Sequence, residues 1–165
     1  MRFVLLAAVF SLYYLAFGFL YALASRRLGS WMIFGAPALW VALEYLRGSL
    51  GFLASPWNLL AHSQHAALPV IQIADLTGAY GVSFVLAMVN QLASQLPELR
   101  VLGPWRWRAQ VGAAGGTLAA TLLYGWVQLA AQAPPTGHLR VALVQANVAP
   151  WSAMSGKEQM AHLAA

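Results

Sequence analysis

Few residues of this 165-residue sequence could carry out chemistry, since it holds only four Asp and Glu, nine Lys and Arg, and four His. It contains no cysteine, which excludes a disulfide scaffold, a cysteine zinc site and a catalytic thiol within this chain. His62 and His65 are three residues apart and could share one helix face. A metal site needs at least one further ligand and none is obvious, so we predict no metal and no cofactor.

Other polar side chains gather in residues 51–75, an apolar stretch that is repeatedly interrupted. The interrupting residues are Pro56, Asn58, His62, Gln64, His65, Pro69, Gln72 and Asp75. They would be costly in contact with lipid, where irregular backbone persists only under a cover of protein or water. We therefore expect an outer-face loop over residues 48–75, or short interfacial helices there, partly folded back over a helical bundle, where a lipid-handling site is plausible.

Glu44 has two interpretations. It could pair with Arg47, one helical turn further on, or be solvated at a helix end. It could also be functional, because an ionisable residue inside a membrane is expensive and is retained for a reason. We favour pairing or solvation, because a position near the outer interface lowers that cost. Asp75 is expected to cap the helix that follows it, since Asp before a helix accepts free backbone N–H groups.

The composition limits which elements can hold these residues. Hydrophobic residues make up 61% of the chain and charged residues 8%, against about half and about a quarter in soluble domains. Soluble and disordered proteins are excluded on this ground. The formal net charge is +5, but the arginines lie at the ends of apolar runs rather than along one face. That distribution is typical of membrane topology, and we predict no nucleic-acid partner.

The apolar runs predict an all-α membrane bundle of about four helices, over residues 3–25, 28–46, 77–97 and 109–132. The first run has 23 uncharged residues. As a helix they reach about 34 Å, more than the hydrocarbon core of about 30 Å. The run is too long for the core of a signal peptide, which has roughly 7–15 apolar residues. Gly112 and Gly116 form a GxxxG spacing, which we interpret as a close contact between helices of the bundle.

The arginines also predict the orientation of the bundle. Two turns, at residues 26–27 and 97–108, hold five arginines, whereas residues 48–81 hold no Lys or Arg. Because basic residues favour the cytoplasmic side, we place both turns in the cytoplasm. The loop at 48–75 and the segment after the fourth helix then lie outside, which in a bacterial inner membrane is the periplasmic side.

Beyond the fourth helix the sequence changes character. Residues 134–138, with two prolines and a glycine, predict a linker after a bundle of residues 1–133. Residues 139–148 form a nearly continuous apolar run, typical of a strand buried on both faces. A lone strand is not stable by itself, so residues 139–165 are expected to begin an α/β domain. In this interpretation the chain is a fragment or the product of a truncated gene.

Four stretches in this order resemble bacterial apolipoprotein N-acyltransferases. They are 43–47 (LEYLR), 56–60 (PWNLL) with Ser63 and Gln64 behind it, 78–84 (GAYGVSF) and 141–148 (VALVQANV). The resemblance covers about residues 28–150 and implies an inner-membrane enzyme, whose helical bundle leads into a periplasmic nitrilase-like catalytic domain that would start at residue 139. The sequence departs from the family at Ala146, where Gly is usual, and at Trp151, which lacks a preceding Lys.

The family moves an acyl chain from a phospholipid to the amino group of a lipidated N-terminal cysteine on a lipoprotein. The implied partners are thus a membrane phospholipid, a lipidated apolipoprotein and the bilayer. The resemblance also implies a thioester on a cysteine, assisted by a glutamate and a lysine, and all three are expected beyond the end of this chain. We expect the outer face, where an acyl chain would gain access, to be lined by Glu44, Arg47, Trp57, Asn58, His62 and Tyr80.

Other interpretations stay open. Trp57 and Tyr80 could anchor the protein at the membrane interface without any substrate, as aromatic side chains do. The chain could be a non-enzymatic scaffold or a transporter subunit, although the internal repeat typical of transporters is not evident. It could also be a degenerate remnant of the enzyme.

Overall fold

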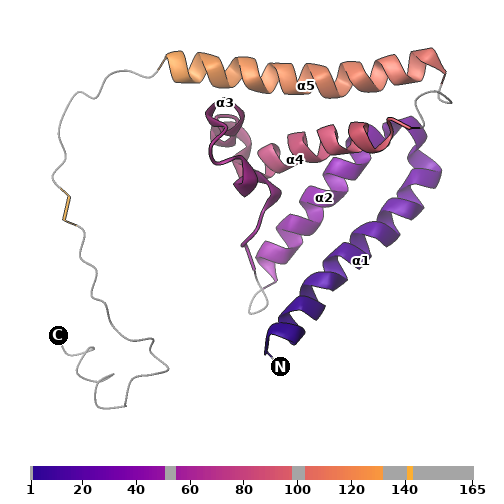
Figure 1. The fold of residues 1–165 in the computed structure, drawn as a ribbon, viewed down its shortest axis with the longest axis vertical. Helices are drawn as coiled ribbons and strands as arrows, with labels where there is room; N and C mark the ends of the chain where they lie inside the picture. Colours follow the sequence, from indigo (N-terminus) through magenta and orange to yellow (C-terminus); the bar gives the residue numbers. More distant parts are fainter. Residues whose placement is uncertain (1, 51–54, 98–102, 132–140, 143–165) are drawn as a thin grey trace. The chain divides into compact units, whose positions relative to one another are not determined.

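A computed structural model describes residues 2–50, 55–97, 103–131 and 141–142. The chain divides into two units, Met1–Gln132 and Ala133–Ala165, and every helix described here belongs to the first. The helices are α1 (Arg2–Leu28), η1 (Gly29–Trp31), α2 (Met32–Ser49), η3 (Leu60–Gln64), α3 (Leu68–Ile71), α4 (Ala74–Ser94) and α5 (Pro104–Ala130) (Figure 1). Since the described residues hold no β-strand, the predicted helical class is confirmed for this part of the chain.

The predicted strand at 139–148 falls almost wholly outside the described residues. Only Val141 and Ala142 are described there, and neither is in a strand. The expected start of a nitrilase-like domain at residues 139–165 therefore stays a prediction.

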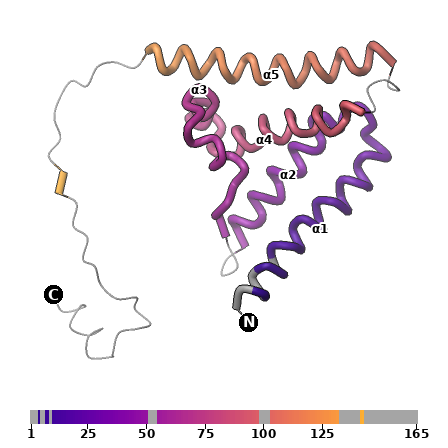
Figure 2. Tube along the Cα trace, in the orientation of Figure 1, coloured from indigo at the N-terminus to yellow at the C-terminus, as the bar shows by residue number. Residues whose placement is uncertain are grey.

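The helices α1 and α2 lie side by side and run in opposite directions, joined by the short 3-10 helix η1 (Figure 2). Gly29, with a φ of +50°, begins this connection. A positive φ costs glycine little, so the chain can turn there without strain. Arg26 and Arg27 stand in the last turn of α1, where positive charge is favourable beside the free carbonyl groups.

The most extensive helix contacts are those between α2 and α4. At their centre Ile33 of α2, Met88 of α4 and Ala114 of α5 form a buried cluster, against which Phe84 and Leu92 pack. The cluster is small for a chain this apolar, so many large hydrophobic side chains are left on the outside of these helices.

The helices bury polar residues and expose apolar ones. The buried polar side chains include Ser83, Gln91, Gln110 and Thr121, and the exposed apolar ones include Leu12, Leu15, Phe19, Leu123 and Trp126. A soluble protein shows the reverse preference. Exposed apolar surface on this scale marks an interaction with a membrane or with other protein.

Within the described residues, α4 is the one helix whose length and composition suit it to crossing a membrane. That observation agrees with a membrane location without testing the number of crossings. The four predicted spans and their boundaries therefore stay a prediction.

Gly78 interrupts α4. Its φ of 65° and ψ of −175° are non-helical, and they divide the helix into a first turn and a longer second part. A side chain at this φ would be strained, which explains why the chain has glycine there. The interruption falls inside the stretch 78–84, so the motif that suggested a family relationship also shapes the backbone just before Tyr80.

The predicted GxxxG contact is wrong for these helices. A Cβ added to Gly112 or Gly116 would meet no atom within 4 Å, so neither glycine lies at a helix interface in this chain. The close approach of α5 occurs instead at Gly125, which is buried, and where an added Cβ would collide with the backbone of Pro69 in α3.

Candidate functional site

The segment 55–67, which carries Trp57, Asn58 and His62, is attached to α2 and α4 by hydrogen bonds to its backbone. At its start, Ser55 N donates to the carbonyl oxygen of Arg47 at 2.9 Å. Further on, Ala61 N donates to the hydroxyl oxygen of Ser83 in α4 at 3.0 Å. Both Ala61 and Ser83 are buried, so this short stretch of irregular backbone is covered and bonded, as the predicted loop at 48–75 requires.

Glu44 provides the central contact to this segment. Its side chain is only 5% exposed, and its Oε1 accepts from the backbone N–H of Leu60 at 2.7 Å and from the indole N–H of Trp40 at 3.0 Å. Leu60 begins η3, and the first N–H groups of a helix have no partner within the helix. The carboxylate therefore satisfies a donor that would otherwise be buried without an acceptor.

Arg47 binds the same segment two residues before Leu60, at Asn58. Its Nη2 donates to the carbonyl oxygen of Asn58 at 3.1 Å, and its guanidinium carbon lies 5.6 Å from the centre of the Phe10 ring. A cation over an aromatic face is attracted by the ring's quadrupole. Asn58 has a φ of 59°, a region that asparagine tolerates better than most residues, and this bend directs its carbonyl oxygen to Arg47.

The predicted pairing of Glu44 with Arg47 is wrong, because both side chains are committed elsewhere. Among the described residues no ion pair joins them, and each bonds instead to the backbone of the segment 55–67. The second carboxylate oxygen, Oε2, and the Nε of Arg47 are buried without a hydrogen-bond partner. These two unsatisfied polar atoms, on residues one helical turn apart, give the site capacity for further hydrogen bonds.

The other predicted site residues, Trp57, His62 and Tyr80, lie outside the buried network. Trp57 is 73% exposed and His62 is exposed, so neither is held in the buried network. The Tyr80 ring packs edge-on against Tyr45 with 5.8 Å between ring centres. Its hydroxyl lies against Gly48, where an added Cβ would come within 3.3 Å. The structure thus bonds Arg47 to Asn58 and Glu44 to the nearby Leu60, and it packs Tyr80 of α4 against Tyr45 of α2.

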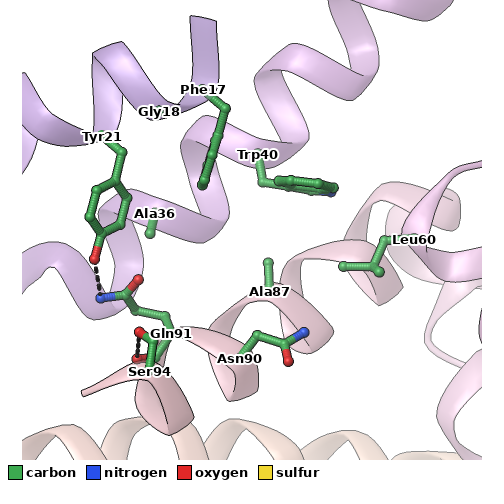
Figure 3. A pocket seen from close by; sticks show the side chains of 10 residues that line it. All are labelled: Phe17, Gly18, Tyr21, Ala36, Trp40, Leu60, Ala87, Asn90, Gln91 and Ser94. Carbon is green, nitrogen blue, oxygen red and sulfur yellow. Dashed lines mark hydrogen bonds between the residues drawn. The ribbon is translucent and has the colours of Figure 1, made fainter. Parts of the chain in front are cut away.

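Two hollows adjoin this network. A small one, of about 40 Å³, is lined by Tyr13, Tyr14, Phe17, Trp40, Leu43, Glu44, Arg47 and Asn58. A larger cavity of about 490 Å³ is lined by Phe17, Gly18, Tyr21, Ala36, Trp40, Leu60, Ala87, Asn90, Gln91 and Ser94 (Figure 3). Phe17 and Trp40 belong to both linings, so the two hollows are neighbours. The larger cavity was not predicted from the sequence. The signal for it was the amide pair Asn90 and Gln91 in an otherwise apolar run.

Asp75 does not cap α4, contrary to the prediction. The helix begins at Ala74, so Asp75 stands inside the first turn, and the residue at the cap position makes no side-chain bond. The carboxylate oxygen Oδ2 of Asp75 instead accepts from the hydroxyl of Tyr124 at 2.7 Å and from Nε2 of Gln128 at 2.9 Å, both in α5. Sequence reasoning missed these partners, although two polar residues one turn apart in an apolar helix were a signal.

Comparison with known protein families gives a match over more than half of the chain. The profile of the apolipoprotein N-acyltransferase N-terminal domain matches residues 1–92. The chain belongs to the apolipoprotein N-acyltransferase family. Within this family's matched region lie all six predicted site residues, Glu44, Arg47, Trp57, Asn58, His62 and Tyr80.

Relatives named apolipoprotein N-acyltransferase come from several bacteria. The chain is 37% identical to one from Geobacter metallireducens, over 71% of this chain and 22% of the relative. It is 35% identical to one from Gloeobacter violaceus, over 69% of this chain and 20% of the relative. It is 27% identical to apolipoprotein N-acyltransferase 2 of Treponema pallidum, over 90% of this chain and 27% of the relative. The chain thus spans only about a quarter of the length of these relatives, and no solved structure matches it.

Proposed function

We propose that this chain is the membrane part of an enzyme that transfers an acyl chain from a phospholipid to the N-terminal S-diacylglyceryl cysteine of a lipoprotein. The single observation that carries this proposal is the family match over residues 1–92, and relatives that bear the name of this activity support it. The buried network at Glu44 falls within that matched region.

The chemistry would proceed in two steps through a thioester. A glutamate would take the proton of the thiol, the thiolate attacks the phospholipid ester, the ester bond breaks, and the lysophospholipid leaves with that proton. The free amino group of the acceptor then attacks the thioester, so that an amide forms and the thiol is restored. A covalent intermediate divides one difficult transfer into two easier ones. This chain has no cysteine. The thiol, and the glutamate and lysine that assist it, would therefore lie in a part of the nitrilase-like domain that is not in this chain.

The helices α1, α2, α4 and α5 would cross the bacterial inner membrane, with the segment 55–67 and the end of α5 on the periplasmic side. The exposed apolar side chains of α1 and α5 support this arrangement. The arginines at 26–27 and 106–108 would then lie on the cytoplasmic side, in agreement with the positive-inside rule.

The six site residues would have different tasks. Glu44 and Arg47 are buried and would hold the segment 55–67 in place from below, with Asn58 as the bonded residue. Trp57, His62 and Tyr80 would line the outer face where the phospholipid approaches. Trp57 also fits an interfacial anchor. The effect of substituting it must therefore be measured both on acyl transfer and on membrane insertion.

A segment exchange tests this proposal. The matching part of the Geobacter metallireducens relative is replaced by this chain's residues, and the chimera is expressed in a strain depleted of lipoprotein N-acylation. We expect growth to be restored and triacylated lipoprotein to be detected by mass spectrometry. The chimera with Trp57→Ala is expected to insert normally and to lose most of the activity, whereas Trp126→Ala, also an exposed tryptophan, is the matched control and keeps it.

A chimera that is abundant in the membrane yet transfers no acyl chain would remove the proposed function. Equal activity of the Trp57→Ala and Trp126→Ala chimeras would instead assign Trp57 to anchoring.

A further inference from the structure

The larger cavity lies where α1 and α4 diverge over α2. Phe17, Gly18 and Tyr21 come from α1, Ala36 and Trp40 from α2, and Ala87, Asn90, Gln91 and Ser94 from α4 (Figure 3). Gly18, Asn90 and Ser94 are exposed, whereas Ala36 is buried. The cavity is therefore open along the boundary between α1 and α4 and closed by α2.

The walls of this cavity are mostly apolar, and their polar side chains are Tyr21, Gln91 and Ser94 at one end and Asn90 beside Ala87 (Figure 3). Figure 3 shows Tyr21 and Gln91 at one side of the open space and Leu60 at the opposite side, with Phe17 and Trp40 between. The carboxamide Nε2 of Gln91 donates to the hydroxyl oxygen of Tyr21 at 3.1 Å. This bond joins α1 to α4 and closes that end, while the small side chains of Ala36 and Ala87 leave the middle of the cavity empty.

The Leu60 end of the cavity adjoins the buried network of the proposed site. Leu60 lines the cavity, and its backbone N–H is the one bound by Glu44. Trp40 also lines it, and its indole N–H is bound by the same carboxylate oxygen. Whatever occupies the cavity thus lies directly beneath the segment that carries Trp57.

The size of the cavity distinguishes the possible occupants. Its volume of about 490 Å³ is within the range of about 300–1,000 Å³ usual for small-molecule sites. Three turns of a helix about 10 Å wide would need roughly 1,200 Å³, so a further helix does not fit. An elongated, uncharged, flexible group does fit, because the lining is mostly apolar and holds no charged side chain.

We propose that this cavity holds the hydrocarbon chain of a phospholipid acyl group. The Tyr21–Gln91 bond closes the far end of the cavity, so that the depth of the cavity selects the length of the acyl chain. The inference rests on the proposed function and assigns to it a specificity-determining site. The acyl tail enters between α1 and α4, and the ester at its head lies on the Leu60 side, under the segment 55–67. Ala87 and Ala36 then form the floor on which the tail lies.

Photocrosslinking of the purified 165-residue chain tests the cavity without any enzymatic activity. The chain is placed in phosphatidylethanolamine nanodiscs that contain a hexadecanoyl phospholipid with a diazirine near the end of the tail. We expect adducts on Tyr21, Phe17 or Gln91. Ala87→Phe fills the cavity and displaces the tail, so we expect about tenfold fewer of these adducts, which corresponds to about 1.4 kcal/mol of lost binding.

Two further variants keep this test interpretable. Gly18→Leu narrows the opening at a position where an added Cβ meets nothing within 4 Å, so it should fold and should also reduce the adducts. Ala93→Phe, exposed on the same helix but outside the cavity, should leave them unchanged. Adducts confined to outward residues such as Leu123, adducts unaffected by both cavity variants, or crosslinks to a second copy of the chain would overturn the proposal.

The chimera separates this inference from the proposed function. With Ala87→Phe it should transfer shorter acyl chains than the unsubstituted chimera, as read from the mass of the lipoprotein. An unchanged distribution of chain lengths would reject the cavity while the acyltransferase proposal stands. If the unsubstituted chimera is inactive, the proposed function falls, and the crosslinking result still decides whether the cavity holds a lipid tail.

Discussion

At the scale of single residues, Glu44 and Arg47 act as two anchors for one segment. They stand one turn apart on α2 and are 5% and 7% exposed. Glu44 binds the N–H of Leu60 and Arg47 binds the carbonyl oxygen of Asn58. Because two charged side chains meet two backbone groups of opposite polarity, the backbone just after Trp57 is held at two points.

Replacing Glu44 should release this segment. Glu44→Ala leaves the N–H groups of Leu60 and Trp40 without their acceptor, which should lower the free energy of unfolding by about 1–3 kcal/mol. The measurement is thermal unfolding in detergent together with the rate of chymotrypsin cleavage after Trp57, which should rise.

Glu44→Gln is the matched control, since it keeps an acceptor oxygen of the same shape and should recover most of the stability. If Glu44→Ala and Glu44→Gln are cleaved at the same rate as the unsubstituted chain, the carboxylate does not hold the segment.

At the scale of elements, α5 comes closest to the backbone of another helix at Gly125. Gly125 of α5 is buried where an added Cβ would collide with the backbone of Pro69 in α3. Gly116, on the same helix, has open space around its Cα. The two glycines therefore make a matched pair of positions.

Gly125→Ala should destabilise the bundle by about 1–3 kcal/mol, because α3 and α5 must move apart to admit the methyl group. Gly116→Ala should be neutral or slightly stabilising, since alanine favours a helix over glycine. Thermal unfolding in detergent measures both. A larger effect at Gly116 than at Gly125 would show that the GxxxG spacing, and not the contact with Pro69, is the important helix contact.

A second connection joins the first turn of α4 to the last turns of α5. Tyr124→Phe removes the 2.7 Å hydrogen bond to Asp75 and should lower the free energy of unfolding only slightly, because both side chains are exposed to solvent. A double-mutant cycle with Asp75→Asn measures the coupling between the two side chains. Strictly additive effects of the two substitutions would mean that this bond contributes nothing to the stability of the bundle.

At the scale of the whole molecule, the absence of cysteine makes the predicted topology directly testable. Ala66→Cys lies in the segment between η3 and α3 and is exposed, so a membrane-impermeant maleimide should label it in spheroplasts. Ser30→Cys, next to the Arg26–Arg27 turn, should be labelled only after the membrane is permeabilised. The opposite labelling pattern would invert the orientation and place the segment 55–67 in the cytoplasm.

The helical class and the family relationship follow from the sequence alone. Both depend on local properties, such as the length of apolar runs, the placement of arginines and short stretches like 43–47 and 56–60. The same stretches supplied Glu44, Arg47 and Asn58, together with Trp57, His62 and Tyr80, as residues expected at one outer face. The first three do meet in one neighbourhood, because the segment 55–67 folds back on α2.

Only the tertiary structure decided which atoms these residues meet. Glu44 and Arg47 were expected to pair because they are one turn apart. Instead, Glu44 accepts from a backbone N–H of the segment 55–67 and Arg47 donates to a backbone carbonyl of that segment, because buried backbone groups require partners. Tyr21 and Gln91 are 70 residues apart in the chain, and Asp75 and Tyr124 are 49 apart. No local pattern encodes such contacts, since they depend on how α1, α4 and α5 cross, and the cavity between α1 and α4 exists only because those helices diverge over α2.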